Sequence, residues 1–146
     1  MAAVPLADDA RVRLTLGEGR SGDSVLDGAW WPRTRDPLIE LPLLVAELAA
    51  VVGAVTRISL DDEGWLTTPR NMPFDRRRTE ICWLSPIDTH EVLVEAHDDV
   101  ELTLLLVPPG AAPIAALAVM AAASRGTSAS RGSQVLATHG LRTGPG

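Results

Sequence analysis

The sequence predicts an α+β domain: a two-layer arrangement in which a mostly antiparallel sheet of about five strands carries two helices on one face. Three observations support this. The 146 residues fit one domain, and a composition of 46% hydrophobic and 22% charged residues is typical of globular proteins. Several short segments alternate apolar and polar residues, as half-buried strands do. Two longer segments repeat apolar residues at helical spacing.

The first strand and the first helix are expected in the amino-terminal third. Residues 11–16 (RVRLTL) alternate polar with apolar side chains, so one face is buried and the other is wet. Asp36 and Pro37 are the cap and first-turn proline of a helix that Gly53, in the αL conformation, would end. Because proline disfavours helical geometry in the preceding residue, the regular helix could instead begin at Pro42.

Two more strands are expected after this helix. Residues 55–60 (VTRISL) follow it directly and would complete a β-α-β unit with residues 11–16, which predicts parallel strands and a right-handed crossover. Residues 79–84 are predicted to be the third strand, with Ile81 and Trp83 on one face.

A β-hairpin is expected from residues 91–96 and 100–107, and its register follows from where the charges would lie. A two-residue turn would place charged side chains on the buried face. A three-residue loop at 97–99 instead brings the apolar faces together. The predicted pairs are Ala96 with Val100, Val94 with Leu102, and Val92 with Leu104.

The last helix is expected from Pro113 to Ser124, with Ile114, Leu117 and Met120 facing the sheet. Together with the preceding strand it forms an uncharged stretch long enough to span a membrane, but internal prolines favour a strand, a turn and a short helix. The predicted domain is residues 1–124. Residues 125–146, rich in Ser, Thr, Gly and Arg, are predicted to be a disordered tail with nothing to bury.

Composition excludes several functions. The net charge of −6 argues against a sequence-independent nucleic-acid binder. The chain has no lysine, which excludes Schiff-base chemistry and a phosphate-loop lysine, and Cys82 is its single cysteine, which excludes a disulfide framework within one chain. No metal or cofactor is predicted. No secretory signal is visible, and we expect a cytoplasmic protein without a membrane anchor.

The segment richest in binding chemistry is DGAWWPRTRDP at residues 27–37. Adjacent tryptophans in an extended chain point to opposite sides, so one is expected in the core and the other at the surface or in a cleft. Arg33 and Arg35, two apart, would lie on one side and could form forked contacts with carboxylates or phosphates. The candidate binding residues are Asp27, Trp30, Trp31, Arg33, Arg35 and Asp36.

An alternative is that both arginines pair with Asp27, Asp36 or Glu40 and only fasten this segment to the helix. A second candidate site is Asp88 with His90, because a carboxylate can orient a histidine as a general base.

The tryptophan segment, followed by ELPLLVAEL, resembles an uncharacterised actinobacterial domain family with the signature GAWWPR-R-D ahead of ELP and a helix. Residues 65–70 (WLTTPR) resemble its second block, and 88–90 resemble a third, with Thr89 where the family has proline. The resemblance implies one folded unit over residues 11 to about 120 and an actinobacterial source, and brings no activity with it.

These observations favour a small cytoplasmic binding or regulatory module whose tryptophan–arginine segment contacts an anionic small molecule or a partner protein. The alternatives are a cofactor-free enzyme with Asp27 or Asp88/His90 as its base, and a purely structural or interaction protein. The oligomeric state is not predicted.

Overall fold

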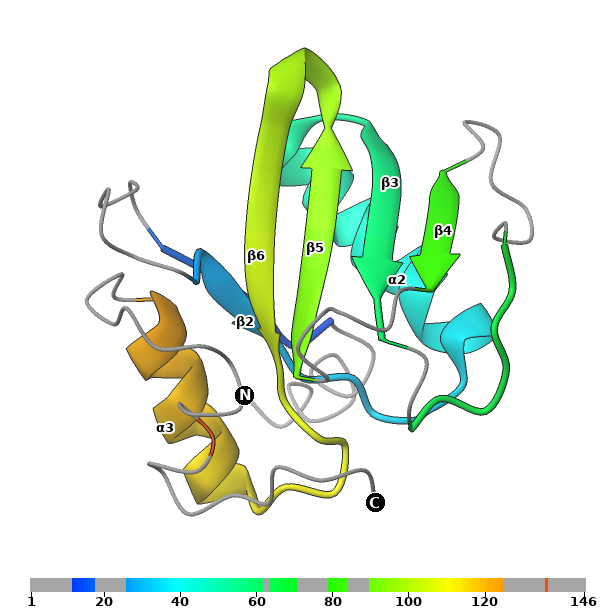
Figure 1. The fold of residues 1–146 in the computed structure, drawn as a ribbon. Helices are drawn as coiled ribbons and strands as arrows, with labels where there is room; N and C mark the ends of the chain where they lie inside the picture. The colour runs from blue at the N-terminus through cyan, green and yellow to red at the C-terminus, as the bar shows by residue number, and fades with distance from the viewer. Residues whose placement is uncertain are drawn as a thin grey trace, which may run out of the picture.

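The computed structural model describes residues 12–17, 26–61, 64–70, 79–83 and 90–124, together with Leu136 (Figure 1). Within these residues the chain forms six strands, two α-helices and one 3-10 turn. In chain order they are β1 (Leu14–Leu16), β2 (Gly28–Trp30), α2 (Pro37–Val52), β3 (Val55–Leu60), β4 (Glu80–Trp83), β5 (Glu91–Ala96), η1 (His97–Asp99), β6 (Val100–Leu106) and α3 (Pro113–Ser124).

The strands form one mixed, mostly antiparallel sheet in the order β1-β2-β6-β5-β3-β4, which confirms the predicted α+β class. Pairing is antiparallel except between β2 and β6 and between β3 and β4, which are parallel. The sheet has one strand more than expected because Gly28–Trp30, the start of the tryptophan segment, pairs with β6.

The β-α-β unit of the fold is β2-α2-β3. β2 runs parallel to β6, and both β6 and β3 run antiparallel to β5, so β2 and β3 point the same way. β1 is antiparallel to β2 and therefore runs opposite to β3. The prediction that residues 11–16 and 55–60 are parallel is wrong, because the unpredicted strand β2 lies between β1 and the helix.

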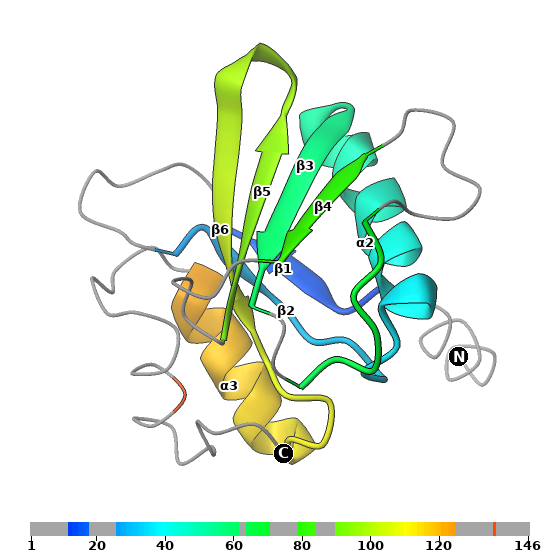
Figure 2. The same ribbon diagram turned by 45° about the vertical axis from the view of Figure 1, so that its right-hand side comes forward.

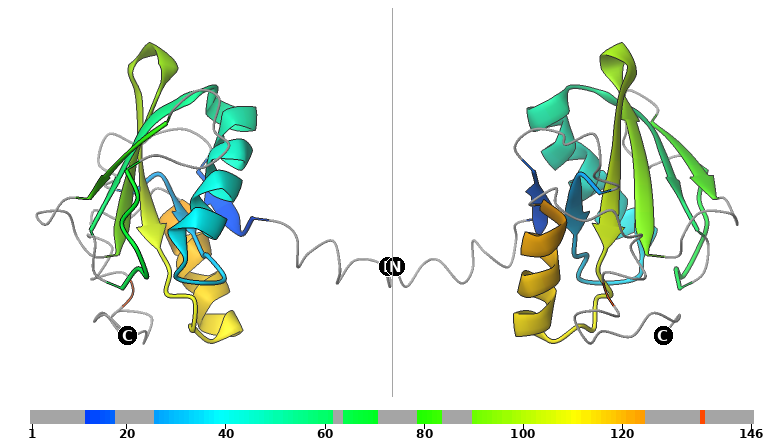
Figure 3. Two further views of the ribbon diagram at one scale, coloured as in Figure 1. Left: turned by 90° about the vertical axis from the view of Figure 1, so that its right-hand side faces the viewer. Right: turned by 60° about the vertical axis from the view of Figure 1, so that its left-hand side comes forward.

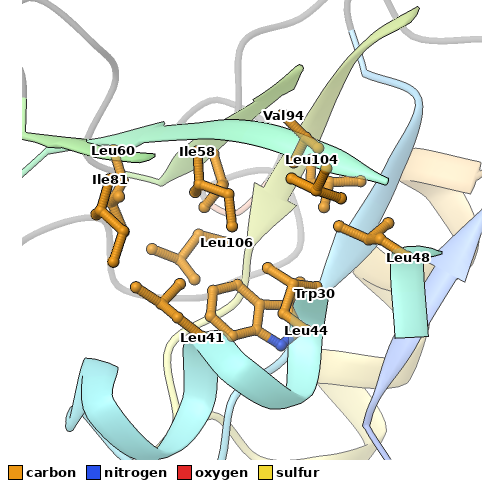
Figure 4. Packing of buried hydrophobic residues seen from close by; sticks show 12 residues of the cluster. Trp30, Leu41, Leu44, Leu48, Ile58, Leu60, Ile81, Val94, Leu104 and Leu106 are labelled. Carbon is orange, nitrogen blue, oxygen red and sulfur yellow. The ribbon is translucent and has the colours of Figure 1, made fainter. Parts of the chain in front are cut away.

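The two helices cover opposite faces of the sheet, which differs from the prediction of two helices on one face, because α2 and α3 belong to separate cores. Figure 3 shows α3 below α2, at the end of the sheet that β1 and β2 form. Neighbouring residues of β2 and β6 enter different cores, as successive side chains in a strand must. We call these cores the α2 core and the α3 core. The α2 core contains Trp30, Leu41, Leu44, Leu48, Val55, Ile58, Leu60, Ile81, Val92, Val94, Leu104 and Leu106 (Figure 4). The α3 core contains Leu26, Ala29, Trp31, Leu105, Val107, Ala116, Val119, Met120, Ala123 and Leu136.

Helix α2 begins at Pro37, as its cap predicts. The Asp36 carboxylate accepts a hydrogen bond from the backbone N–H of Leu38 at 3.0 Å. Pro42 lies inside the helix, so the alternative start at Pro42 is wrong. Gly53 follows the last helical residue with φ 86° and ψ −169°, which has the expected positive φ but is not the αL conformation.

The hairpin has the predicted register, with Ala96 opposite Val100, Val94 opposite Leu102, and Val92 opposite Leu104. Its loop is η1, in which both aspartates have φ of 61°. A three-residue loop containing left-handed residues is a common way to connect antiparallel strands, and aspartate tolerates that conformation better than most residues do.

Helix α3 spans the predicted residues but faces the sheet with a different side. Its buried residues are Ala116, Val119, Met120 and Ala123. Ile114 is 87% exposed and Leu117 is 61% exposed, so the prediction that these two face the sheet is wrong and only Met120 was placed correctly. Alanine side chains let the helix lie close to β1 and β2. A Cβ added at Gly17 would be 2.5 Å from the backbone oxygen of Ser124.

The carboxyl-terminal segment contributes one described residue. Leu136 is fully buried in the α3 core, so the expectation that residues 125–146 have nothing to bury is wrong at this position. Residues 125–135 and 137–146 lie outside the described residues. The uncharged stretch before them forms β6, a turn and α3, and neither helix in the described part of the chain is long and apolar enough to cross a membrane.

Candidate functional site

The tryptophan segment runs from β2 through a bend into the first turn of α2, so its residues lie in a strand, in a bend and at the start of a helix. Trp30 is 1% exposed in the α2 core, and Trp31 is 6% exposed in the α3 core. The prediction that the two side chains point to opposite sides is confirmed. The expectation that one of them lies at the surface is wrong, because helices cover both faces of the sheet here.

The two aspartates of the segment bind backbone groups. The carboxylate of Asp27 accepts a hydrogen bond from the N–H of Thr103 at 2.8 Å, and the N–H of Asp27 donates to the carbonyl of Thr103 at 2.7 Å. These contacts join the start of β2 to β6. Asp36 is the cap of α2 described above. Both residues therefore hold the segment in place.

Glu40, on the first turn of α2, ties the bend to the helix. Its carboxylate accepts hydrogen bonds from the backbone N–H of Arg33 at 3.3 Å and from the hydroxyl of Thr34 at 2.9 Å. The Glu40 side chain is buried, and these donors replace the water that it loses. This contact fastens the bend to the helix through the backbone of Arg33 and the hydroxyl of Thr34.

Residues 33–35 form a bend, so the extended conformation in which Arg33 and Arg35 were expected to lie on one side is not present. Nη1 of Arg35 donates to the carbonyl of Gly64 at 3.2 Å, and the Arg35 carbonyl accepts from the N–H of Leu66 at 2.9 Å. Gly64 has φ of 85°, and a Cβ there would lie 2.8 Å from Nη1 of Arg35. Arg35 thus holds the loop at residues 64–66.

Arg13 is a central residue of the site that the sequence analysis missed. Its guanidinium carbon lies 3.6 Å above the centre of the Trp31 ring. Nε of Arg13 donates to the Trp31 carbonyl at 3.0 Å, and an Nη donates to the Pro32 carbonyl at 3.1 Å. The alternation of residues 11–16 placed Arg13 correctly on the face opposite the leucines, but spacing alone does not reveal a tryptophan partner.

The positive charge of Arg33 acts on the guanidinium of Arg13. The pKa of the Arg13 guanidinium lies below its usual value, first because its half-buried position removes water and second because the positive charge of Arg33 is near. The negative charge of Glu40 acts in the opposite direction. The site therefore combines two guanidinium groups with one buried carboxylate.

The indole nitrogen of Trp31 adds an unusual feature. Nε1 is buried and has no hydrogen-bond acceptor within the part of the chain that the structure describes. A buried donor without a partner costs free energy, roughly 1–3 kcal/mol, and is rare in folded proteins. The Trp31 ring is thus held by apolar packing and by the cation of Arg13.

Three other tryptophans form a line from the α2 core toward the surface. Trp30 stacks on Trp65 with ring centres 5.9 Å apart, and Trp65 meets Trp83 edge-on at 6.3 Å. The indole N–H of Trp83 donates to the Pro69 carbonyl at 2.8 Å. The loop that contains Trp65 therefore packs against β4, which is the strand at one edge of the sheet.

The second candidate site stays a prediction. Asp88 lies outside the described residues, and His90 is buried at the start of β5, where its backbone carbonyl accepts from the N–H of Leu106 at 2.7 Å. Among the residues that the structure places, no group of three or more histidine, cysteine, aspartate or glutamate side chains could hold a metal ion.

Comparison with known proteins identifies one family. Searches of curated proteins and of solved structures found no match. A family model described as a family of unknown function, DUF5994, matches residues 11–123, which is well over half of the chain and includes the tryptophan segment, Arg13, α2, and α3 except for its last residue. The chain therefore belongs to this family of unknown function.

Proposed function

We propose that this protein is a small binding module that recognises an anionic group, a carboxylate or a phosphate, between Arg13 and Arg33. One observation carries the proposal: the Arg13 guanidinium lies over the Trp31 ring and binds the Pro32 carbonyl, one residue before Arg33, whose positive charge lowers the pKa of Arg13. Both arginines are half-buried, so their charges are less screened than charges in open water. A bound anion would remove this repulsion.

The site is organised before any ligand arrives. The stacked position of Arg13 on Trp31 and its two bonds to backbone carbonyls fix the orientation of the guanidinium group. A guanidinium has more N–H donors than these two bonds use, and its planar fork matches carboxylate and phosphate oxygens. Because the side chain is already ordered, binding costs less conformational entropy.

Glu40 supports this reading. The negative charge of Glu40 opposes the effect of Arg33 on the pKa of Arg13. The two carboxylate oxygens of Glu40 also accept hydrogen bonds from the backbone N–H of Arg33 and from the hydroxyl of Thr34. Its role is therefore to shape the bend that carries Arg33.

The alternative of an enzyme with Asp27 as its base has less support, because the Asp27 carboxylate accepts a hydrogen bond from the backbone N–H of Thr103. The cytoplasmic location and the actinobacterial source inferred from the sequence are part of this proposal.

Titration with inorganic phosphate and with citrate, at constant ionic strength, tests the proposal by thermal unfolding. A ligand that binds only the folded state at about 100 times its Kd stabilises that state by roughly 2.7 kcal/mol. We expect a rise in Tm that saturates with concentration and that Arg33→Gln abolishes. Arg57→Gln is the matched control, since Arg57 is an exposed arginine paired with Glu80 and Glu95 on the other part of the sheet. A Tm that neither anion raises, or an equal rise in Arg33→Gln, would contradict the proposal.

A further inference from the structure

We infer that two copies of this chain associate through the outer edge of strand β1, which pairs antiparallel with β1 of the second copy and joins the two sheets into one. This inference is independent of the proposed function. β1 is the last strand on one side of the sheet, and its neighbour among the described strands is β2, which lies beside it (Figure 2).

Hydrogen bonds to β2 show which backbone groups of β1 point to the outer edge. The N–H of Trp31 donates to the Arg13 carbonyl at 2.9 Å, and the N–H of Gly17 donates to the Asp27 carbonyl at 2.8 Å. In an antiparallel pair, residues that bond to the neighbouring strand alternate with residues that do not. Arg13, Thr15 and Gly17 therefore bond toward β2, and the N–H and C=O groups of the residues between them point outward.

These outward groups belong to Leu14 and Leu16, and within the described part of the chain they have no hydrogen-bond partner. A row of unpaired N–H and C=O groups at a sheet edge is a template for pairing with another strand. At the opposite edge of the sheet, the N–H of Ile81 in β4 donates to the Arg70 carbonyl at 3.0 Å, so a loop covers that strand. Of the two edges, β1 is the one that is open to pairing.

Both cores are centred on the inner strands of the sheet. The α3 core includes Ala29 of β2 and Leu105 of β6 but no residue of β1. On the other face, Val12, Leu14 and Leu16 are only partly buried against the α2 core. A strand added beside β1 would cover these three side chains, so association buries apolar surface as well as pairing the backbone.

The order of side chains around Leu14 fits a second copy of the same strand. In a two-fold antiparallel pair centred on Leu14, this residue faces its counterpart and Val12 faces Leu16 of the second copy. All the apolar side chains of the strand then meet apolar ones. On the other face of the sheet, Arg13 faces Thr15 of the second copy, so the two arginines are not directly opposite each other.

Charge at the strand permits this pairing. Arg13 is the one charged residue between positions 12 and 17, and its guanidinium is turned toward β2, where it binds the carbonyls of Trp31 and Pro32. Residues 12–17 of either copy thus place no charged group against the leucines. The net charge of −6 on each chain repels the other copy at longer range, so screening by salt should strengthen the association.

Analytical ultracentrifugation of the full-length protein tests the inference. We expect a mass that rises with concentration from 15.5 kDa toward twice that value, and a higher dimer fraction as NaCl is added. Leu14→Pro removes the outward N–H and with it both hydrogen bonds of the central pair, in a position where edge strands tolerate proline. It should weaken dimerisation roughly tenfold or more. Leu14→Val keeps the N–H and is the matched control, which should dimerise as the unchanged protein does. Circular dichroism checks that each variant is folded.

Disulfide cross-linking locates the contact without proline. With Cys82 replaced by serine, Leu14→Cys should form a disulfide between chains under mild oxidation, because Cα atoms of a hydrogen-bonded antiparallel pair are about 5.5 Å apart. Leu66→Cys is the control, since Leu66 is 70% exposed in the loop at the opposite edge of the sheet. It should stay largely unlinked.

Any of four results would overturn the inference. The first is the mass of a single chain at every concentration up to about 1 mM, which would leave the edge to a strand of another protein. The second is dimerisation that folded Leu14→Pro protein retains unchanged. The third is cross-linking of Leu66→Cys as fast as that of Leu14→Cys. The fourth is a dimer that weakens as salt is added, because ion pairs would then hold the two copies together.

Discussion

At the scale of single residues, the tryptophan pair determines how the site is built. Adjacent positions in a strand send side chains to opposite faces, so Trp30 and Trp31 each need a separate core. Trp31 lies near the edge of its core, where the guanidinium of Arg13 covers its ring. The same arginine binds the carbonyls at 31 and 32, so one side chain orders the backbone that leads to Arg33.

Replacement of Arg13 by alanine should therefore destabilise the fold as well as the site. It removes a cation–π contact of about 1–2 kcal/mol and two hydrogen bonds from a charged donor, and we expect a loss of roughly 2–4 kcal/mol in the free energy of unfolding. Arg13→Lys keeps the charge but replaces the planar fork that donates from two nitrogens with a single ammonium, so its stability should lie between those of the unchanged protein and Arg13→Ala. Urea unfolding followed by circular dichroism measures this. If Arg13→Ala lowers the free energy of unfolding by less than about 0.5 kcal/mol, as substitutions of surface residues usually do, the contacts of Arg13 do not stabilise the fold.

At the scale of elements, the sequence predicts best where local chemistry decides the structure. The hairpin register follows from apolar pairs on adjacent strands, and the start of α2 follows from Asp36 and Pro37. Strand β2 could not be predicted, because three residues without alternation pair in parallel with β6, far away in the sequence. The facing of α3 could not be predicted either. Nearly every residue of this helix is apolar, so the close approach to β2, and not the pattern, decides which side is buried.

The facing of α3 can be tested with two adjacent residues. Ala116 is fully buried against the sheet, and Leu117 is mostly exposed. Ala116→Leu should cost about 1–3 kcal/mol because it overpacks a close contact, whereas Leu117→Ala should change the free energy of unfolding by no more than about 0.5 kcal/mol. Chemical denaturation of both variants gives the comparison. The reverse order would mean that α3 faces the sheet with the side that the sequence pattern suggested.

The cap of α2 gives a second test at this scale. Asp36→Ala removes the side-chain acceptor for the Leu38 N–H and should cost about 1 kcal/mol, whereas Asp36→Ser keeps an acceptor and should retain most of the stability. Both variants should still bind the anion, because the contacts that hold Arg33 come from Glu40. Equal stability of the alanine and serine variants would contradict the assigned cap.

At the scale of the whole molecule, one sheet separates two cores, and the candidate site lies where the chain crosses between them. The tryptophan segment and Arg33 can be located from the sequence, but Arg13 cannot. That residue is brought to Trp31 by the antiparallel pairing of β1 with β2, which no local pattern encodes. The number of covered faces, in contrast, could have been predicted, because the uninterrupted apolar run at the end of β6 indicates burial on both faces.

The α3 core includes Leu136, and this leads to a prediction for the intact chain. A fully buried leucine that becomes alanine costs about 2–5 kcal/mol, so Leu136→Ala should lower the free energy of unfolding by that amount. A chain that ends at Ser124 lacks Leu136 altogether and should lose at least as much. Because β2 and β6 contribute neighbouring residues to both cores, the loss should appear in one transition, with tryptophan fluorescence and circular dichroism changing together. Leu117→Ala is the control for an exposed leucine. If the chain ending at Ser124 melts within a degree or two of the full chain, Leu136 does not stabilise the α3 core, and residues 11–123 hold both cores alone.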